Sequence, residues 1–463
     1  MTFVDRDEEL SILDDEFRQF PKRASLVVIY GRRRVGKTEL IKEFGKKRNH
    51  IYLLATLQSK EEVIRNFSLK IAAFFGDESV LAQPHTTWEG FFEYLARELK
   101  ARKTPLILAF DEFTYLIQQD HAVPSIFQYY WDEKLKDLPV MLVLCGSYVG
   151  MMEKEVLSYK SPLYGRSTRQ LFVLELDFKY LHEFMPGYPK EQLVELYAIL
   201  GAVPFYLLQF DQDKLPMDNV RTVFLDKSRS LFNDGLLLLR EEVKEPRNYL
   251  SILKAISFGK TTPKEIADNA HLDPLLVGKY LDVLRGMKLV SRFVPVTEKN
   301  PEKSRKGIYR ITDHYYDFWL KFVYPYSDYV EEGRQAELVK NIIAPNFSAY
   351  VGRAFEALAR KKFIEMNRKG GLPSVFEHIG SWWSGETEID LVALNPKTKE
   401  ILFAEVKWSD LKEGEVSGIL SGLKEKAALV KWNNDCRKEY YAVIAKKLPK
   451  KRKDALLMDL DDF

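Results

Sequence analysis

Hydrophobic positions in the first 175 residues form short unbroken runs, separated by stretches with helical periodicity. The runs Ser25–Tyr30, Pro105–Phe110 and Pro139–Cys145 have the length of strands. Strands that are buried on both faces of a parallel sheet show this continuous apolar pattern. The segments 61–75 and 88–102 have the spacing of amphipathic helices. The pattern therefore predicts an α/β fold in which helices cover a parallel sheet.

The pattern changes after about residue 176. Residues 176–240 are helical in pattern, with Gly201–Pro204 interrupting two apolar stretches. A helix should begin after Thr262, because Thr262-Pro-Lys-Glu265 is a capping box with proline at the first helical position. A second helix is expected from Asp273-Pro274 to Arg285, followed by a hairpin of Leu289–Val296 and Ile308–Ile311. Three helices and a hairpin within 245–311 outline a winged helix.

The remaining chain begins with an aromatic stretch, His314–Tyr324, for which we expect a packing role. The C-terminal pattern predicts a helix at 346–365, two alternating strands around the turn Asn395–Glu400, a helix at 416–431 and a strand at 439–445. The basic cluster Lys446–Lys453 is typical of a solvated surface.

Composition limits the class of protein more than it identifies one. A chain of 463 residues should form two to four domains. The net charge of +3 neither requires nor excludes a nucleic-acid partner. Two isolated cysteines argue against a disulfide framework or a zinc site and suit a reducing cytosol. Because the N-terminus lacks a signal-like apolar core and the apolar runs are short, we expect a cytoplasmic protein without membrane segments.

Residues 31–38 match the phosphate-binding pattern G-x-x-x-x-G-K-[ST] at every position. The segment follows an apolar strand and precedes a helical stretch, which is the context that this chemistry requires. Its backbone N–H groups and the helix N-terminus would bind phosphate. We expect Lys37 to reach the β- and γ-phosphates and the Thr38 hydroxyl to hold Mg²⁺. The predicted contacts to ATP in this segment are Gly31, Arg32, Arg33, Arg34, Val35, Gly36, Lys37, Thr38 and Glu39.

Asp111 and Glu112 follow the second buried run. We expect Asp111 to complete the Mg²⁺ coordination and Glu112 to polarise the attacking water. Ser147 is either a γ-phosphate sensor or the cap of the next helix. Arg166 is either an arginine finger or sensor, acting in cis or in trans, or an ordinary surface arginine.

Several segments together resemble the archaeal-type AAA+/STAND-related ATPases over essentially the whole chain. They are Phe3–Leu10, the phosphate-binding loop, Phe110–Phe113, Pro162–Arg166 and Gly201–Pro204. The resemblance implies that Phe3, Val4, Arg6 and Pro204 lie near the adenine. Ala202 departs from the family pattern, which has glycine at this position.

A second acidic constellation lies near the C-terminus. Glu405 and Lys407 are two positions apart on a predicted strand and so project from the same face. The hairpin through 395–400 would bring Asp390 beside them. Two carboxylates and a lysine can hold Mg²⁺ and orient water against a phosphodiester. This constellation resembles the PD-(D/E)xK restriction-endonuclease-like fold, which implies that Glu356 on the preceding helix joins Asp390 and Glu405 at the metal.

The sequence thus predicts an α/β multidomain protein that uses ATP and Mg²⁺. The expected parts are a P-loop NTPase core at 1–175, a helical lid at 176–244, a winged helix at 245–313, an aromatic and helical connector at 314–345 and a nuclease-like α/β domain at 346–463. The winged helix either reads DNA through Lys279 and Arg285 or is a packing or regulatory module.

Two functions from different classes follow. In the first, ATP hydrolysis controls DNA binding and Mg²⁺-dependent DNA cleavage. In the alternative, the chain is a nucleotide-gated signalling or regulatory switch whose nuclease-like domain binds without cutting. A motor is less favoured, because the sequence shows no helicase motif or substrate-gripping loop. A homo-oligomer is possible: a ring that forms on ATP addition would favour a motor or an arginine finger in trans, whereas a persistent monomer would favour the switch.

Overall fold

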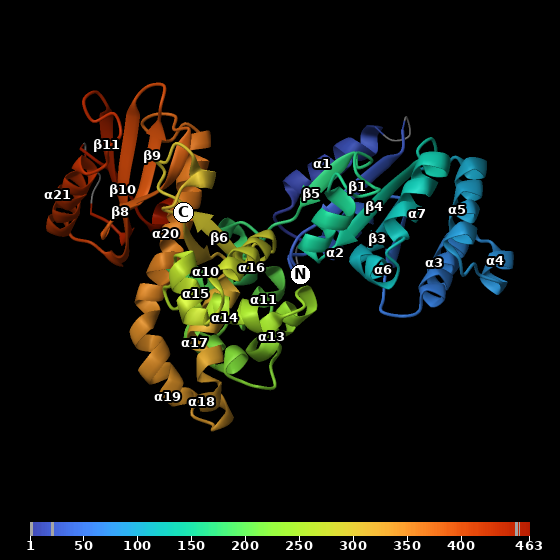
Figure 1. Ribbon diagram of the computed structural model, residues 1–463, viewed down its shortest axis with the longest axis horizontal. Helices are drawn as coiled ribbons and strands as arrows, with labels where there is room; N and C mark the ends of the chain where they lie inside the picture. Colours follow the sequence, from blue (N-terminus) through green and yellow to red (C-terminus); the bar gives the residue numbers. More distant parts are fainter. Residues whose placement is uncertain (1–2, 20–22, 450–451, 453) are drawn as a thin grey trace. The chain divides into compact units, whose positions relative to one another are not determined.

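The computed structural model describes residues 3–19, 23–449, 452 and 454–463. The chain divides into two compact units (Figure 1). The first comprises Met1–Leu176 with Val203–Phe205, and the second comprises Asp177–Ala202 with Tyr206–Phe463. A bilayer-spanning helix does not occur in the part of the chain that the structure describes.

The first unit is built on a parallel sheet with the strand order β2-β3-β4-β1-β5. The strands are β1 (Ser25–Tyr30), β2 (His50–Leu54), β3 (Leu106–Asp111), β4 (Val140–Gly146) and β5 (Arg169–Phe172). The three predicted strands are confirmed within one residue at each end. Sequence analysis did not single out β2 and β5, which lie at the two edges of the sheet and have fewer buried positions.

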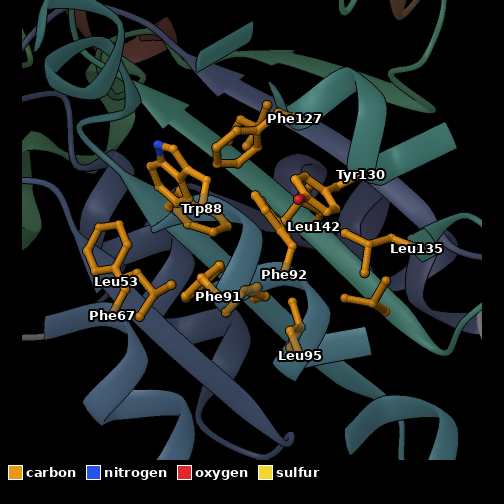
Figure 2. Packing of buried hydrophobic residues seen from close by; sticks show 14 of the residues in the cluster. Leu53, Phe67, Trp88, Phe91, Phe92, Leu95, Phe127, Tyr130, Leu135 and Leu142 are labelled. Atoms are coloured by element: carbon orange, nitrogen blue, oxygen red, sulfur yellow. The ribbon is translucent and has the colours of Figure 1, made fainter. Parts of the chain in front are cut away.

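Helices cover both faces of this sheet because successive side chains on each strand point to opposite faces. They are α1 (Asp7–Gln19), α2 (Lys37–Gly45), α3 (Lys60–Phe75), α4 (Glu78–Ala82), α5 (Trp88–Arg102), α6 (Phe113–Gln119), α7 (Val123–Tyr130) and α8 (Val149–Met152). Val28 and Phe110 face the cluster that contains Trp88, whereas Val27 and Ala109 face the opposite cluster. Figure 2 shows the aromatic packing around Trp88.

The second unit begins with helices and continues with a hairpin. The helices are α9 (Leu181–Phe184), α10 (Lys190–Leu200), α12 (Pro216–Asn219), α13 (Ser230–Glu242), α14 (Pro246–Ser257), α15 (Pro263–Ala270), α16 (Pro274–Gly286), α17 (His314–Phe322), α18 (Ser327–Glu331) and α19 (Gln335–Leu338). A short helix, α11 (Pro204–Leu207), contains residues assigned to both units.

Short turns of other helical types occur in both units. The π-helical turns are Trp131–Leu135, Glu153–Leu157, Val220–Phe224 and Val339–Ile343, and the 3-10 turns are Phe178–Tyr180, Pro301–Lys303, Tyr324–Tyr326 and Leu460–Asp462.

The predicted starts of α15 and α16 are confirmed by their caps. Thr262 and Glu265 form the capping box of α15, and the Asp273 carboxylate accepts a hydrogen bond from Leu275 N at the start of α16. The hairpin strands are β6 (Val290–Phe293) and β7 (Ile308–Ile311). The first strand is shorter than predicted, because Pro295 has no N–H to donate to a ladder.

The aromatic stretch forms α17, and its packing role is confirmed. Tyr315 donates a hydrogen bond to Leu231 O, and Trp319 donates to Phe232 O. Both carbonyl groups belong to α13, so the buried aromatic side chains fasten α17 to that helix.

The C-terminal part of the second unit is a mixed sheet flanked by helices. Its elements are α20 (Ala344–Arg368), β8 (His378–Ser384), β9 (Thr387–Asn395), β10 (Glu400–Asp410), α21 (Glu413–Ala428), β11 (Lys438–Lys447) and β12 (Leu456–Met458). The strand order is β12-β11-β10-β9-β8. β9 pairs antiparallel with β8 and β10, whereas β10 and β11 are parallel. The helix predicted at 416–431 lies three residues earlier, with the Glu415 carboxylate accepting a hydrogen bond from Lys412 N at its start.

Candidate functional sites

The phosphate-binding loop joins β1 to α2 and adopts backbone angles that require glycine. Gly31 has a φ of 156° and Gly36 a φ of 95°. A Cβ atom at position 31 would lie 2.4 Å from Val173 O, so a side chain there would collide with the backbone. The Lys37 side chain is buried, and its ammonium group donates to Gly31 O at 2.9 Å and Arg32 O at 2.7 Å. The loop therefore holds the lysine charge beside its own backbone, at the N-terminus of α2.

Asp111 joins the phosphate-binding loop to β3. Its Oδ2 atom accepts hydrogen bonds from the hydroxyl groups of Thr38 at 2.7 Å and Tyr52 at 2.5 Å. Its Oδ1 atom accepts one from Glu112 N at 2.9 Å. The structure thus brings together the two residues predicted to hold Mg²⁺, Thr38 and Asp111.

Tyr52 is a member of this cluster that sequence analysis missed. It lies on β2, which pairs with β3. Burial and the hydrogen bond to Asp111 raise the pKa of the Tyr52 phenol, so it stays a proton donor. A single tyrosine on a short edge strand matches no motif, and only the pairing of β2 with β3 would have indicated its position.

Glu112 has a strained backbone and a partly satisfied carboxylate. Its φ of 54° is in the left-handed region, which non-glycine residues seldom adopt. Ser147 Oγ donates to Glu112 Oε1 at 3.0 Å. Within the described part of the chain, the buried Oε2 atom accepts no hydrogen bond. Ser147 does not cap α8, whose N-cap is Tyr148, but contacts the residue predicted to polarise water.

Arg6 braces the phosphate-binding loop. Its guanidinium donates to Val35 O at 2.9 Å and Leu174 O at 2.8 Å, and it pairs with Glu9 at 3.1 Å. The partly buried Phe3 side chain packs against the hydrophobic cluster that contains Val35. The adenine contacts of Phe3, Val4 and Arg6 stay predictions, because the Arg6 guanidinium bonds to two backbone carbonyl groups and to the Glu9 carboxylate.

The consecutive arginines of the loop point to aromatic partners. Arg33 donates to the Tyr115 hydroxyl at 3.0 Å. The Arg34 guanidinium lies 4.2 Å from the centroid of the Phe205 ring, directly after Pro204. Pro204 is therefore next to a residue that contacts the phosphate-binding loop, and its contact with the adenine stays a prediction.

Arg166 is engaged within its own unit. Its Nη2 atom lies 2.7 Å from Asp132 Oδ2, and Nε lies 3.0 Å from both oxygens of that carboxylate. Nη1 also donates to Pro162 O at 2.8 Å. A role as arginine finger or sensor stays a prediction, and it would require this ion pair to open.

The C-terminal sheet assembles the predicted Asp390, Glu405 and Lys407 cluster. Lys407 Nζ lies 2.7 Å from Glu405 Oε2 and 3.4 Å from Asp390 Oδ2. Asp390 Oδ2 also accepts a hydrogen bond from Val406 N at 2.8 Å. Burial and the negative charge of Glu405 raise the pKa of Asp390 to about 6, whereas the hydrogen bonds from Lys407 and Lys426 hold the pKa of the buried Glu405 below its usual value.

Lys426 is a second residue that sequence analysis missed. It lies on α21, and its Nζ atom is 2.7 Å from Glu405 Oε1. The Glu405 carboxylate is buried between two partly exposed ammonium groups. Lys426 comes twenty-one residues after Glu405 and lies on the helix that follows β10. No short sequence motif has this spacing.

The charges of Asp390 and Lys407 in this cluster also act on Glu356, which lies on α20. Burial and the charge of Asp390 raise its pKa to about 7, while Arg310 and Lys407 lower it. Among the described residues, however, no three His, Cys, Asp or Glu side chains gather closely enough to hold a metal ion. The expected three-carboxylate set of Glu356, Asp390 and Glu405 is therefore not assembled in this conformation, in which two ammonium groups occupy the oxygens of Glu405.

Comparison with known proteins places the chain by family. A family model described as an ATPase domain predominantly from Archaea matches residues 3–210, and one described as archaea bacterial proteins of unknown function matches residues 319–419. An uncharacterized protein of Methanocaldococcus jannaschii is 36% identical over 100% of both chains. An uncharacterized ATP-binding protein of the same organism is 52% identical over 42 residues, which cover 9% of this chain and 68% of that one.

A solved structure supports the fold of the chain. The Walker-type ATPase of Pyrococcus abyssi aligns with a TM-score of 0.52 at 22% identity, covering 69% of this chain and 96% of that chain. At this identity the likeness concerns the fold alone. The parallel sheet, the complete phosphate-binding pattern and the matched ATPase model agree with one another. The chain therefore belongs to the family of the full-length Methanocaldococcus jannaschii relative and is a P-loop ATPase.

Proposed function

We propose that ATP hydrolysis in the first unit controls a Mg²⁺-dependent DNA phosphodiesterase in the C-terminal sheet. The observation that carries this proposal is the convergence of Asp390, Glu405 and Lys407 on one buried cluster. The element order α20-β8-β9-β10-α21-β11, with β10 and β11 parallel, agrees with the PD-(D/E)xK interpretation. Within this proposal the five segments keep the boundaries expected from the sequence, with α14–α16 and the hairpin as the winged helix.

At the ATP site, each side chain has a distinct role in the proposal. Lys37 exchanges its loop carbonyl partners for the β- and γ-phosphate oxygens. Thr38 and Asp111 would hold Mg²⁺, which would supply positive charge next to the phosphates. Tyr52 keeps the Asp111 carboxylate in its orientation. Glu112 turns its Oε2 atom to the attacking water, while Ser147 holds Oε1.

The donor set of the second site suits a divalent cation in its chemistry. Asp390 and Glu405 supply carboxylate oxygens, which Mg²⁺ prefers. Their burial, which raises the pKa of Asp390, would be offset by a bound cation. When bound, the cation would polarise the phosphodiester and acidify a bound water. Lys407 would orient a water molecule, whose oxygen forms a new bond to phosphorus and loses a proton to solvent, while one bridging P–O bond breaks and the leaving oxygen takes up a proton from solvent.

The alternative function, a nucleotide-gated switch that binds without cutting, has one observation in its favour. Lys407 and Lys426 both form ion pairs with Glu405, so the charge of the carboxylate is already neutralised without a metal ion. In this alternative the ion-paired cluster is a structural element of the second unit. ATP hydrolysis by the first unit would then regulate a partner and not a bond cleavage.

DNA cleavage distinguishes the two functions. Plasmid and linear DNA are incubated with Mg²⁺ or Mn²⁺, using the wild type, Asp390→Asn and Lys407→Met. The nuclease function requires metal-dependent cutting that both variants lose while their ATPase activity stays unchanged. A wild-type protein that hydrolyses ATP but leaves every DNA substrate intact would support the switch.

A further inference from the structure

We propose that the loop between β6 and β7, residues 294–307, binds the DNA backbone and leads it to the carboxylate cluster of the C-terminal sheet. This inference rests on the proposed phosphodiesterase function and names the surface that delivers its substrate. It assigns DNA binding to the β6–β7 loop and Arg310, and not to the helix α16 that a winged helix ordinarily places in the major groove.

The β6–β7 loop is fastened to the C-terminal sheet. Val296 N donates a hydrogen bond to Ser381 O of β8 at 2.9 Å. The Val296 side chain packs against the hydrophobic cluster of the same sheet. Gly380 makes this close approach possible, since a Cβ atom there would lie 3.2 Å from Val296 Cβ. Whatever the loop binds is therefore held at the edge of the sheet that carries the acidic cluster.

Arg310, on β7, brings a positive charge to the face of the carboxylate cluster. Its Nη2 atom lies 3.0 Å from Glu388 Oε1. Glu388 and Asp390 are two positions apart on β9, so their side chains project from one face. The charge of Arg310 also acts on the half-buried Glu356 carboxyl group, which is influenced in addition by Asp390, Glu388 and Lys407. Arg310 thus stands where a phosphate approaching Asp390 would need a cation.

The charge of the loop is complementary to a polyanion. Residues 297–310 contain five lysine and arginine residues against two glutamates. Lys306 pairs with Glu298 at 2.8 Å. Lys299, Lys303 and Arg305 are exposed, and none of them has an ion-pair partner in the described part of the chain. Such cations release counterions when they contact phosphates, which favours binding at low salt.

Hydrogen bonds from Arg292, near the end of β6, hold the shape of the β6–β7 loop. Arg292 Nη1 donates to Pro301 O at 2.8 Å, and Nη2 donates to Ser304 O. Gly307 lies against this guanidinium, where a side chain would collide with it. The exposed cations are therefore presented by an ordered loop, which lowers the entropy lost on binding.

The exposed face of α16 has a different chemistry. Leu275, Leu276 and Val283 are 83%, 42% and 41% exposed. The helix has two basic residues, Lys279 and Arg285, and Arg285 pairs with Asp282 at 3.1 Å. An apolar face with so few cations is poorly suited to a phosphate backbone.

The experiment compares two charge reversals of equal size in the full-length chain. The loop variant is Lys299→Glu, Lys303→Glu and Arg305→Glu, and the matched variant is Lys264→Glu, Lys279→Glu and Arg285→Glu on α15 and α16. Binding of a fluorescent 30-base-pair duplex is measured by anisotropy in EDTA, so that no cutting occurs, at several KCl concentrations. We expect the loop variant to bind at least about tenfold more weakly, with a salt slope reduced by about 2–3. The matched variant should keep at least half of the wild-type affinity.

Equal losses in both variants, or a loss confined to the α16 variant, would overturn the inference. So would a wild type that does not bind the duplex at low salt. Failure of the proposed function gives a different result, namely loop-dependent DNA binding without cleavage when Mg²⁺ is added. Circular dichroism and unchanged ATPase activity confirm that the variants are folded, and Arg310→Gln provides a single-residue variant with the same expected direction.

Discussion

Lys426 Nζ lies 2.7 Å from Glu405 Oε1, whereas Lys407 Nζ lies 2.7 Å from Oε2, the other oxygen of the same buried carboxylate. A divalent cation that binds Glu405 must displace at least one of these ammonium groups. A displaced lysine would then be available to a phosphate oxygen near the cation. The ion pair between Lys426 and Glu405 therefore opposes the binding of a divalent cation. Once the lysine is displaced, its charge favours binding of the substrate phosphate.

Lys426→Met should tighten divalent-cation binding and slow DNA cleavage. Removing a partly exposed ammonium group from Glu405 removes roughly 1 kcal/mol of competition, which corresponds to about fivefold tighter binding. Mn²⁺ binding is measured by calorimetry without nucleotide, with Asp111→Asn in every protein compared, because Asp111 is the carboxylate proposed to hold the metal at the ATP site. Lys426→Arg keeps the charge and serves as the control. Unchanged or weaker Mn²⁺ binding in Lys426→Met would show that the lysine does not compete with a cation.

Tyr52→Phe should reduce ATP hydrolysis without removing ATP binding. The substitution keeps the ring and removes the hydroxyl group that donates to Asp111. Loss of a hydrogen bond to a charged group is worth about 1.5–3 kcal/mol, so we expect kcat to fall at least about tenfold and the Mg²⁺ requirement to rise. Steady-state ATPase assays over a Mg²⁺ titration measure both quantities. Wild-type values for both would mean that the hydrogen bonds from Thr38 and Glu112 N suffice to fix the Asp111 carboxylate.

Glu112→Gln should separate nucleotide binding from hydrolysis. The amide keeps the size of the side chain but cannot polarise water as the carboxylate does, so kcat should fall by about 10²-fold or more. Binding of a fluorescent ATP analogue should stay within about threefold of wild type. Lys37→Ala, in contrast, should weaken both binding and hydrolysis. A Glu112→Gln protein that turns over ATP at the wild-type rate would assign the water-polarising role to another residue.

Asp317 should make the free energy of unfolding depend on pH. Burial raises its pKa from 3.8 to about 6, although Arg353 and Lys321 act in the opposite direction. Between these values the folded state binds more protons than the unfolded state. The contribution of Asp317 to stability is therefore complete below about pH 4 and is lost as the pH rises through 6, by at most about 1.4 kcal/mol per pH unit.

Chemical denaturation at pH 4.5, 5.5, 6.5 and 7.5 tests this dependence. Asp317→Asn mimics the protonated acid, so the variant should gain stability relative to wild type as the pH rises. EDTA is present throughout, to exclude cation binding at the carboxylate cluster. A constant difference between the two proteins across this range would show that Asp317 does not titrate there.

The local sequence pattern was sufficient to predict those parts of the protein whose contacts are with residues nearby in the chain. The phosphate-binding loop, its flanking strand and helix, and the capping box at Thr262 each depend on a few consecutive residues. The Asp390 to Lys407 cluster was accessible for the same reason, since a short hairpin joins β9 to β10.

The missed residues depend on long-range pairing. Tyr52 reaches Asp111 only because β2 lies beside β3, and Lys426 reaches Glu405 only because α21 packs against β10. The contact of the β6–β7 loop with Ser381 joins segments eighty-five residues apart. Hydrophobic periodicity shows which face of an element is buried but not which element covers it, so these contacts required the tertiary structure.

Single-turnover DNA cleavage shows whether the ATPase controls the C-terminal site. Cleavage by the wild type is measured with Mg²⁺ and ATP, ADP or no nucleotide, beside Glu112→Gln with ATP. We predict that the rate changes at least about tenfold between nucleotide states, and that Glu112→Gln stays in the ATP-bound rate because it does not hydrolyse the nucleotide. Equal cleavage rates in all four reactions, or no cleavage in any of them, would mean that ATP hydrolysis does not control DNA cleavage by this protein.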